Sequence, residues 1–175
     1  MELPDPHHLH LVCYPAPLLH QRNLPVGDFG DELRSFAEGM LRFMVKAEGV
    51  GLAAPQIGAP IRLFVCNATG NPEDSLVFVN PQFVELDGGV EAEEGCLSVP
   101  GARVTMRRAA RAVIEAQSLD GTSFRMTGHD LQARVWQHEM DHLDGRLIVD
   151  NMSAADEIAN RRTVKQLKED YQQAR

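Results

Sequence analysis

The sequence predicts an α+β fold in a single domain over residues 1–175, with a run of antiparallel strands enclosed by helices. Three observations lead to this prediction. A helical apolar pattern comes first, a long stretch of short β-branched segments with turn signals follows, and two further helical patterns end the chain. This order differs from the strand–helix alternation that is typical of parallel sheets. No repeat, low-complexity tract or long linker divides the chain, so no internal domain boundary is expected.

The first elements are an irregular segment and a helix. Residues 1–27 are rich in proline, and we expect them to run irregularly over the surface. A helix is expected next, because apolar residues recur at three- and four-residue steps and form one stripe. The stripe consists of Leu33, Phe36, Ala37, Met40 and Met44. Gly49 is expected to end this helix.

Strands are expected in the middle of the chain, where β-branched and aliphatic residues alternate with turn signals. Their ranges are 61–66, 75–86, 102–106 and 111–118. Turns are expected at 67–75 and 86–89, and Asp120-Gly121 is typical of a hairpin tip. Two helices close the chain: one over 129–144 that ends at Gly145, and a C-terminal helix over 153–175 that begins at Ser153 with capping-box spacing.

Composition and charge argue against several classes of partner. The chain is 43% hydrophobic with a formal net charge of −8 and a pI near 5.3, which disfavours binding to DNA. No apolar run approaches the roughly 20 residues that span a bilayer, so no membrane partner is expected. The first ten residues resemble neither a signal nor a transit peptide. The three cysteines are widely spaced, which favours a reducing compartment such as the cytoplasm.

The sharpest local signal is the pentapeptide from His138 to His142, with Glu139 directly after the first histidine. On a helix, positions i and i+4 share one face, so two imidazoles can bind one cation while the carboxylate reaches a water as general base. The alternative is an exposed helix with two ordinary histidines. A catalytic metal site of the first kind needs a third protein ligand, and no suitable residue follows the motif.

An upstream cysteine is the remaining candidate for that ligand. Cys96 lies in a segment flanked by Gly95 and Pro100 that could expose its thiolate. Cys66 lies within an apolar run and is expected in the core, because free cysteines are often buried. Cys13 has no motif around it and is expected to be structural.

Three segments together resemble the signature motifs of the peptide deformylase family, in the same order and with similar spacing. They are Gly49–Gln56, Glu94–Ser98 and Gln137–Gly145. The resemblance implies antiparallel sheets around a central helix that carries both histidines. It also implies the metal ligands Cys96, His138 and His142 and a native Fe(II) ion, with zinc or nickel as substitutes.

The resemblance further implies a mechanism and a substrate. The metal activates a water, Glu139 serves as general base and then general acid, and the Gln56 amide and the Leu97 backbone N–H stabilise the oxyanion. The substrate is the N-formylmethionyl end of a nascent peptide, which lies along an edge strand. The residues implied to contact it are Val50, Gly51, Gly95, Arg103, Arg134 and Val135. Arg134 replaces the small or aliphatic residue of some members, which leaves the methionine pocket open to question.

Two rival functions remain at the level of sequence: a general metallopeptidase and a catalytically inactive binding protein with the same fold. The upstream cysteine disfavours the first, and the presence of the base and all ligands disfavours the second. The basic residues of the last helix favour a solvated helix face, with a ribosome contact as the alternative. They are Arg161, Arg162, Lys165, Lys168 and Arg175. A bacterial cytoplasm is expected as the location, with an organelle interior as the alternative.

Overall fold

The computed structural model describes residues 3–174, and its strands form two antiparallel sheets. The larger sheet has five strands in the order β1-β2-β3-β6-β7. Their bounds are β1 Gly51–Ala53, β2 Leu63–Cys66, β3 Leu76–Asp87, β6 Arg111–Gln117 and β7 Ser123–His129. The smaller sheet pairs β4 (Val90–Cys96) with β5 (Val99–Arg108). Every pair of strands is antiparallel, so the predicted α+β class is confirmed.

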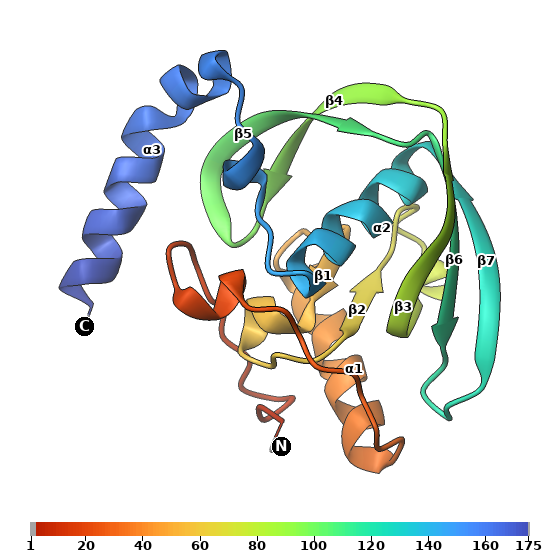
Figure 1. The fold of residues 1–175 in the computed structure, drawn as a ribbon. Helices are drawn as coiled ribbons and strands as arrows, with labels where there is room; N and C mark the ends of the chain where they lie inside the picture. The colour runs from red at the N-terminus through yellow and green to blue at the C-terminus, as the bar shows by residue number, and fades with distance from the viewer. Residues whose placement is uncertain (1–2, 175) are drawn as a thin grey trace.

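In the described part of the chain, three α-helices accompany the sheets: α1 (Asp31–Lys46), α2 (Asp130–Leu143) and α3 (Ala154–Gln173). Figure 1 shows α2 in the middle of the molecule, with β3, β6 and β7 beside it and the β4–β5 hairpin arching over it. The predicted arrangement of sheets around a central histidine-bearing helix is therefore confirmed. The helix α3 lies apart, on the outer side of β5 (Figure 1). Within residues 3–174, no helix combines the length and apolar character that crossing a membrane requires.

The helix α1 forms because its apolar stripe is buried on one side. All five residues of the predicted stripe are buried, and they join the core that β1 and β2 also line. The end of the helix differs from the prediction. The residue with a left-handed backbone is Glu48, with φ 56°, and the Gly49 N–H returns to the Met44 carbonyl at 2.9 Å.

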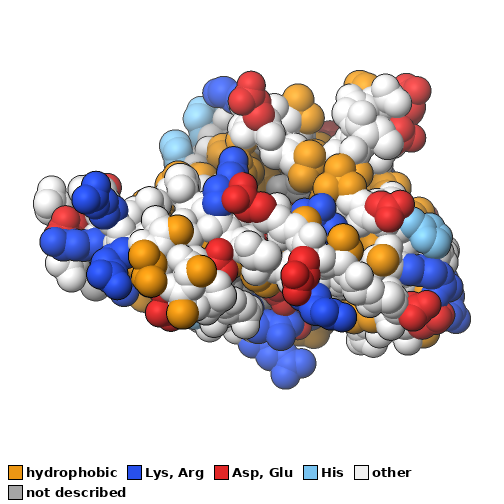
Figure 2. Space-filling view, turned by 90° about the horizontal axis from the view of Figure 1, so that it is seen from above, with side chains coloured by type: hydrophobic (Ala, Val, Ile, Leu, Met, Phe, Trp, Pro, Cys, Tyr) orange, Lys and Arg blue, Asp and Glu red, His pale blue; other side chains and the backbone are white. Residues whose placement is uncertain are grey.

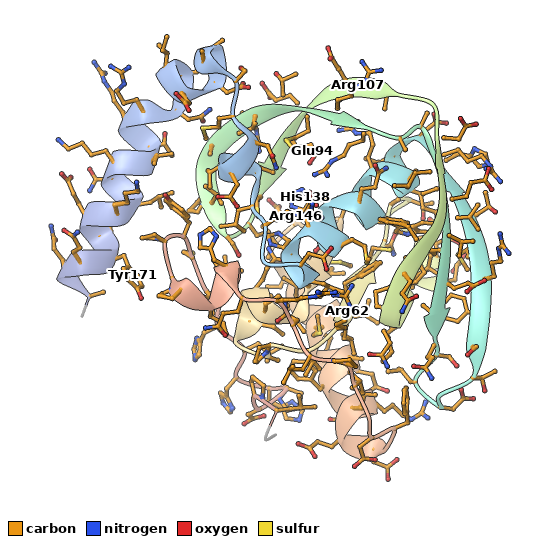
Figure 3. All side chains as sticks on the ribbon, viewed as in Figure 1. Arg62, Glu94, Arg107, His138, Arg146 and Tyr171 are labelled. Carbon is orange, nitrogen blue, oxygen red and sulfur yellow. The ribbon has the colours of Figure 1, made fainter. Side chains whose placement is uncertain are left out.

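The helix α2 presents an apolar face to the five-stranded sheet. Trp136 is fully buried and packs edge-on against Phe78, with ring centroids 5.2 Å apart, and Phe78 stacks on Phe64 at 4.7 Å. Cys66 lies in the same core, as predicted, and is 1% exposed. Because aromatic rings bury large areas, this cluster fixes α2 on the sheet. The face with His138 is thereby turned toward the β4–β5 hairpin (Figure 3).

The N-terminal segment is irregular, as predicted, but it does not only follow the surface. Its short 3₁₀ turn Pro17–His20 buries Leu19. Asn23 is 3% exposed, and its side-chain amide donates to the carbonyls of His142 and Leu143 at 3.0 and 3.1 Å. The last carbonyls of a helix lack partners within the helix. The segment therefore enters the interior to bind the buried C-terminal end of α2.

The remaining differences concern strands that the sequence did not indicate. Neither β1 nor β4 was predicted, and β5 is longer than the predicted 102–106. The predicted Asp120-Gly121 hairpin joins β6 to β7, and α2 ends before Gly145. The turn predicted at 86–89 is shorter, because β3 continues through Asp87 and only residues 88–89 join it to β4. At the start of α3, the Ser153 hydroxyl accepts a hydrogen bond from the Asp156 N–H at 3.1 Å, as its capping-box spacing predicted.

Candidate metal centre

Three side chains with metal-binding atoms meet between the β4–β5 hairpin and α2. Cys96 is the last residue of β4, and His138 and His142 lie one turn apart on α2. One donor atom from each lies within 4.8 Å of the others, and Cys96 Sγ is 3.3 Å from His142 Nε2. A tetrahedral ion with ordinary bond lengths would hold a sulfur and a nitrogen about 3.6 Å apart. The donor set therefore fits one divalent cation.

The orientation of His138 is fixed by a carboxylate above it. His138 Nδ1 lies 3.0 Å from Glu94 Oε2, which leaves the other ring nitrogen for a metal. Figure 3 shows Glu94 reaching from the hairpin toward His138 on α2. His142 is 1% exposed, and its Nδ1 has no hydrogen-bond partner among the described residues. Burial lowers the pKa of His142 well below its ordinary value, so its imidazole is neutral as a metal ligand requires.

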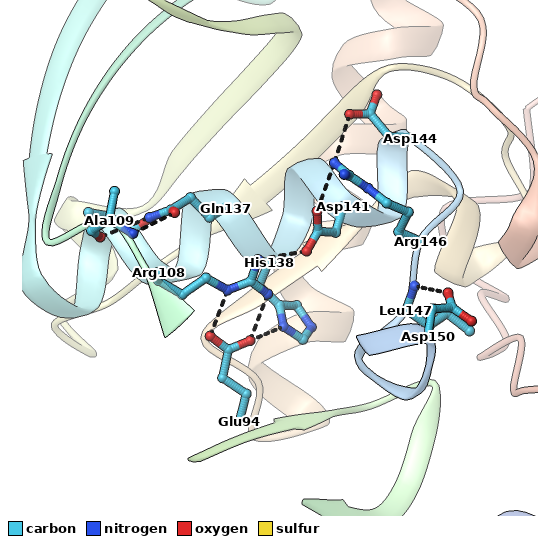
Figure 4. A network of polar contacts seen from close by, with 11 residues as sticks. Glu94, Arg108, Ala109, Gln137, His138, Asp141, Asp144, Arg146, Leu147 and Asp150 are labelled. Atoms are coloured by element: carbon cyan, nitrogen blue, oxygen red, sulfur yellow. Dashed lines mark hydrogen bonds and ion pairs between the residues drawn. The ribbon is translucent and has the colours of Figure 1, made fainter. Parts of the chain in front are cut away.

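An ion-pair network supports Glu94 (Figure 4). Arg108 donates to both Glu94 oxygens at 2.9 Å and to Asp141 Oδ2 at 2.6 Å. Burial acts to raise the pKa of Glu94, but hydrogen bonds from Arg108 and His138 outweigh it and lower that pKa to about 2. Arg146 continues the network, 2.9 Å from Asp141. The hairpin is therefore tied to the histidine helix through charge-assisted hydrogen bonds.

Glu139 lies buried at the floor of the site. It is 3% exposed, and its Oε2 has no hydrogen-bond partner among the described residues. Burial raises its pKa to about 7. A Cβ on Gly51 would lie only 2.8 Å from Glu139 Cδ and 2.9 Å from Val135 Cγ1. Only glycine at position 51 allows β1 to approach this carboxylate so closely.

The side-chain amide of Gln56 is held by hydrogen bonds within its own motif, Gly49–Gln56, and with the motif Glu94–Ser98. Gln56 lies in the 3₁₀ turn Ala54–Ile57 after β1, and its Oε1 accepts from the Ala53 N–H at 2.8 Å. Its Nε2 lies 3.2 Å from Ser98 Oγ and 3.7 Å from Cys96 Sγ. The side-chain N–H groups thus face the candidate metal ligands. Leu97 lies at the tip of the hairpin, because Cys96 pairs with Val99.

A cavity of about 410 Å³ opens over these groups. All of the residues that the sequence singled out for catalysis, metal binding or substrate contact line it, except His142, which lies beneath. Arg103 and Arg134 both line the cavity. Position 134, where the arginine replaces the smaller residue of some family members, is therefore part of the cavity wall. The structure adds lining residues that the sequence analysis did not select: Glu48, Gly49, Glu93, Glu94, Pro100 and Leu131.

Some of these residues carried a signal that could have revealed them. Leu131 is one helical turn before Val135 on the same face of α2, so a helical pattern predicts that the two lie together. Glu94 directly precedes the Gly95-Cys96 pair. Arg108 has no such signal, because its link to Glu94 and Asp141 arises only when the hairpin folds over α2.

The arrangement is suited to hydrolysis of an amide. It combines a thiolate and two imidazoles for a metal, a buried carboxylate beside them, and an amide donor aimed at the same space. These are the groups that activate a water, transfer its proton and stabilise an oxyanion. The edges of β1 and β4 border the cavity, and each of these strands pairs with only one other strand among the described residues. An extended peptide can therefore hydrogen-bond there.

Comparisons with known proteins agree with this chemistry. Residues 8–157 match the family model described as polypeptide deformylase. A peptide deformylase of Acidobacterium capsulatum is 44% identical over 146 residues, which cover 82% of this chain and 86% of that protein. The chloroplastic peptide deformylase 1B of Oryza sativa subsp. japonica is 37% identical over 95% of this chain and 63% of its own length. The crystal structure of a peptide deformylase from Legionella pneumophila superposes with a TM-score of 0.87 at 40% identity, covering 95% of this chain and 98% of that one.

Proposed function

This chain belongs to the polypeptide deformylase family, and on that premise we propose how its own residues carry the reaction. It is a peptide deformylase, a metal-dependent hydrolase that removes the formyl group from N-formylmethionyl peptides and releases formate. The observation that carries the assignment of residues is the meeting of Cys96, His138 and His142 with buried Glu139 at one cavity.

We propose that Cys96, His138 and His142 hold the metal and that the native ion is Fe(II). A divalent ion on such ligands acts as a Lewis acid and lowers the pKa of a coordinated water. The same thiolate and imidazole donors accept zinc and nickel, so the ligand set alone does not select iron. Protein purified without oxygen should contain iron and lose activity in air. An equally active, air-stable zinc form would contradict the choice of iron.

Glu139 is proposed as the proton-transfer group. Its carboxylate lies directly after the ligand His138 and, within the described chain, one of its oxygens has no protein partner. From this place it takes a proton from the attacking water and delivers it to the leaving amine. The side-chain amide of Gln56 and the backbone N–H of Leu97 are proposed to bind the oxyanion, because both residues line the cavity beside Cys96.

The peptide is proposed to lie between the free edges of β1 and β4. Val50, Gly51 and Gly95 offer backbone groups at the cavity without bulky side chains at the two glycines. Val135, together with the stem of Arg134, is proposed to contact the methionine side chain. Arg103 would face the residues that follow methionine. A peptide in extended form would then present its formyl group to the metal ligands.

The two rival functions make different predictions from this one. A general metallopeptidase would cleave unformylated peptides, whereas a deformylase leaves them intact. A catalytically inactive relative would bind formylated peptides without releasing formate. The site retains the base and all three ligands, which supports an active enzyme. Formate release from formyl-Met-Ala-Ser, with no cleavage of Met-Ala-Ser, would exclude both rivals.

We also propose that α3 contacts the ribosome. Figure 2 shows Lys and Arg side chains gathered at the end of the molecule that α3 forms, on the left, although the chain as a whole is acidic. A local basic surface favours contact with RNA phosphates. Ribosomes should therefore co-sediment with the full chain but not with a truncation after Met152. Equal co-sedimentation of both, or none of either, would contradict this contact.

The site of action is proposed to be a compartment in which formylated chains are made. The bacterial relative from Acidobacterium capsulatum supports a bacterial cytoplasm, and the relative from rice that is named chloroplastic supports an organelle interior as the alternative. Fractionation of the source cells would decide between the two.

A further inference from the structure

Asn160 is a buried residue on α3, and its side-chain amide binds the backbone of one residue of β5. It is 5% exposed, whereas its neighbours on the helix are mostly exposed. Its Oδ1 accepts from the Arg103 N–H at 3.0 Å, and its Nδ2 donates to the Arg103 carbonyl at 2.7 Å. The Nδ2 group also donates to the Asp156 carbonyl at 2.9 Å. The amide therefore pairs with the edge of β5 as a neighbouring strand would.

Further contacts of α3 follow the same edge. Asp156 Oδ1 accepts from the Thr105 N–H at 3.3 Å. A Cβ on Gly101 would lie 3.5 Å from Thr163 Cγ2. The residues of β5 that α3 meets thus alternate, at 101, 103 and 105, as expected for one edge of a strand. Arg103 is the middle one of these and the one held by two hydrogen bonds.

The side chain of Arg103 crosses the hairpin and reaches the cavity. Its guanidinium occupies the space beside Gly95, where a Cβ would overlap it and would lie 2.8 Å from Arg103 Cζ. The side chain itself is 65% exposed, and the nearest carboxylate, that of Glu93, is 3.8 Å away. An exposed pair of this length holds a side chain only weakly. The strongest contacts of Arg103 are instead at its backbone, where Asn160 binds both its N–H and its carbonyl and so fixes the point from which the side chain starts.

We propose that Asn160 is a positioning residue for the peptide substrate, acting through Arg103. The inference rests on the proposed function, because it takes the cavity as the path of the peptide. Asn160 keeps β5 at the distance at which the Arg103 guanidinium lies over Gly95. The residues that follow formyl-methionine meet that guanidinium, while the formyl group meets the metal ligands and Glu139. Recognition of the peptide beyond methionine thus depends on the docking of α3.

The test compares formate release from formyl-Met-Ala-Ser and from formyl-Met amide. Asn160→Ala should raise KM for the longer peptide about fivefold, the effect of losing hydrogen bonds of ordinary strength, with kcat unchanged. KM for formyl-Met amide should stay the same. In an Arg103→Ala background, Asn160→Ala should add nothing further. Gln166→Ala, an exposed position on α3, is the matched control and should behave as wild type.

Amide hydrogen exchange tests the clamp without reference to activity. Asn160→Ala should speed exchange of the Arg103 N–H about tenfold or more, because its acceptor is removed. Asn160→Asp keeps the shape but sets an acceptor against the Arg103 carbonyl, so it should give the same selective rise in KM and serves if the alanine variant does not fold.

Three results would overturn the inference: an equal rise in KM for both substrates, additive effects in the double variant, or unchanged exchange at Arg103. A wild type that releases no formate from either substrate would instead reject the proposed function, and this inference with it.

Discussion

At the scale of single residues, the backbone of Gly51 is packed tightly against the side chain of Glu139. The strand β1 passes so near the buried carboxylate that any side chain at position 51 would meet it. Positions 51 and 139 are far apart in the sequence, so this contact is a product of the fold. It explains why the glycine of the first motif is needed for the placement of the carboxylate in the third.

Gly51→Ala is expected to impair catalysis far more than folding. The added Cβ would displace the Glu139 carboxylate, and a misplacement of about 1 Å costs about a hundredfold in rate. Formate release at saturating substrate measures this loss. Gly27→Ala is the matched control, because no atom of the described residues lies within 4 Å of a Cβ there. A Gly51→Ala variant with the rate of wild type would show that the carboxylate does not need its present place.

The buried thiol of Cys66 should make the stability of the protein depend on pH. Burial raises the pKa of its thiol to about 12, against an ordinary value of 9.0. The folded state thus favours the protonated form, so its contribution to stability is present below pH 9 and is lost as pH rises beyond it. Between pH 9 and 12, wild type should lose about 1.4 kcal/mol per pH unit more than Cys66→Ala. Urea unfolding at pH 8 and 10 measures this difference, and parallel pH profiles of the two proteins would contradict it.

At the scale of elements, the contact between the β4–β5 hairpin and α2 depends on Arg108. This guanidinium is 8% exposed and joins Glu94 of β4 to Asp141 of α2. Glu94 in turn holds His138, so the ion pairs connect the packing of two elements to the geometry of the candidate metal ligands. We therefore expect that a change which loosens the packing of the hairpin on α2 also lowers the affinity of the site for a metal.

Arg108→Met is expected to reduce the free energy of unfolding by about 3 kcal/mol, because it leaves buried carboxylates unpaired. It should also weaken metal binding by up to about tenfold, because Glu94, the hydrogen-bond partner of His138, loses the guanidinium that holds it. Urea unfolding and titration with a chelating dye measure the two effects. Arg111→Met removes only the partly exposed pair with Glu85 and should cost at most about 1 kcal/mol. Equal losses in the two variants would contradict the account.

The elements differ in how well the sequence predicts them. The three helices follow from apolar periodicity and end signals, because α1 and α2 bury one stripe and α3 has a true capping box. The strand β4 was not predicted, because Val90 and Ala92 are its only aliphatic residues, and Glu91, Glu93 and Glu94 are a residue type that is depleted in strands. It is held instead by pairing with β5, in which Glu91 stands opposite Arg107. Tertiary pairing of this kind leaves no local pattern.

At the scale of the whole molecule, the site is assembled where three parts of the chain meet. The sequence predicts the candidate metal ligands, the candidate base and the candidate oxyanion donors, because each lies in a short motif of recognisable composition. It does not predict Arg108, Asn160 or the burial of Glu139, because these depend on how the hairpin, α2 and α3 pack on one another. The motifs thus predict the reacting groups, and only the fold shows how those side chains are held.

The most direct test of the account is formate release from formyl-Met-Ala-Ser by anaerobically Fe(II)-loaded protein, with wild type beside Glu139→Ala. Glu91→Ala, an exposed acid on β4, is the matched control. The account predicts turnover by wild type and control, and a loss of at least about a thousandfold in Glu139→Ala with its metal retained. No formate from the loaded wild type, or an undiminished rate in Glu139→Ala, would contradict it.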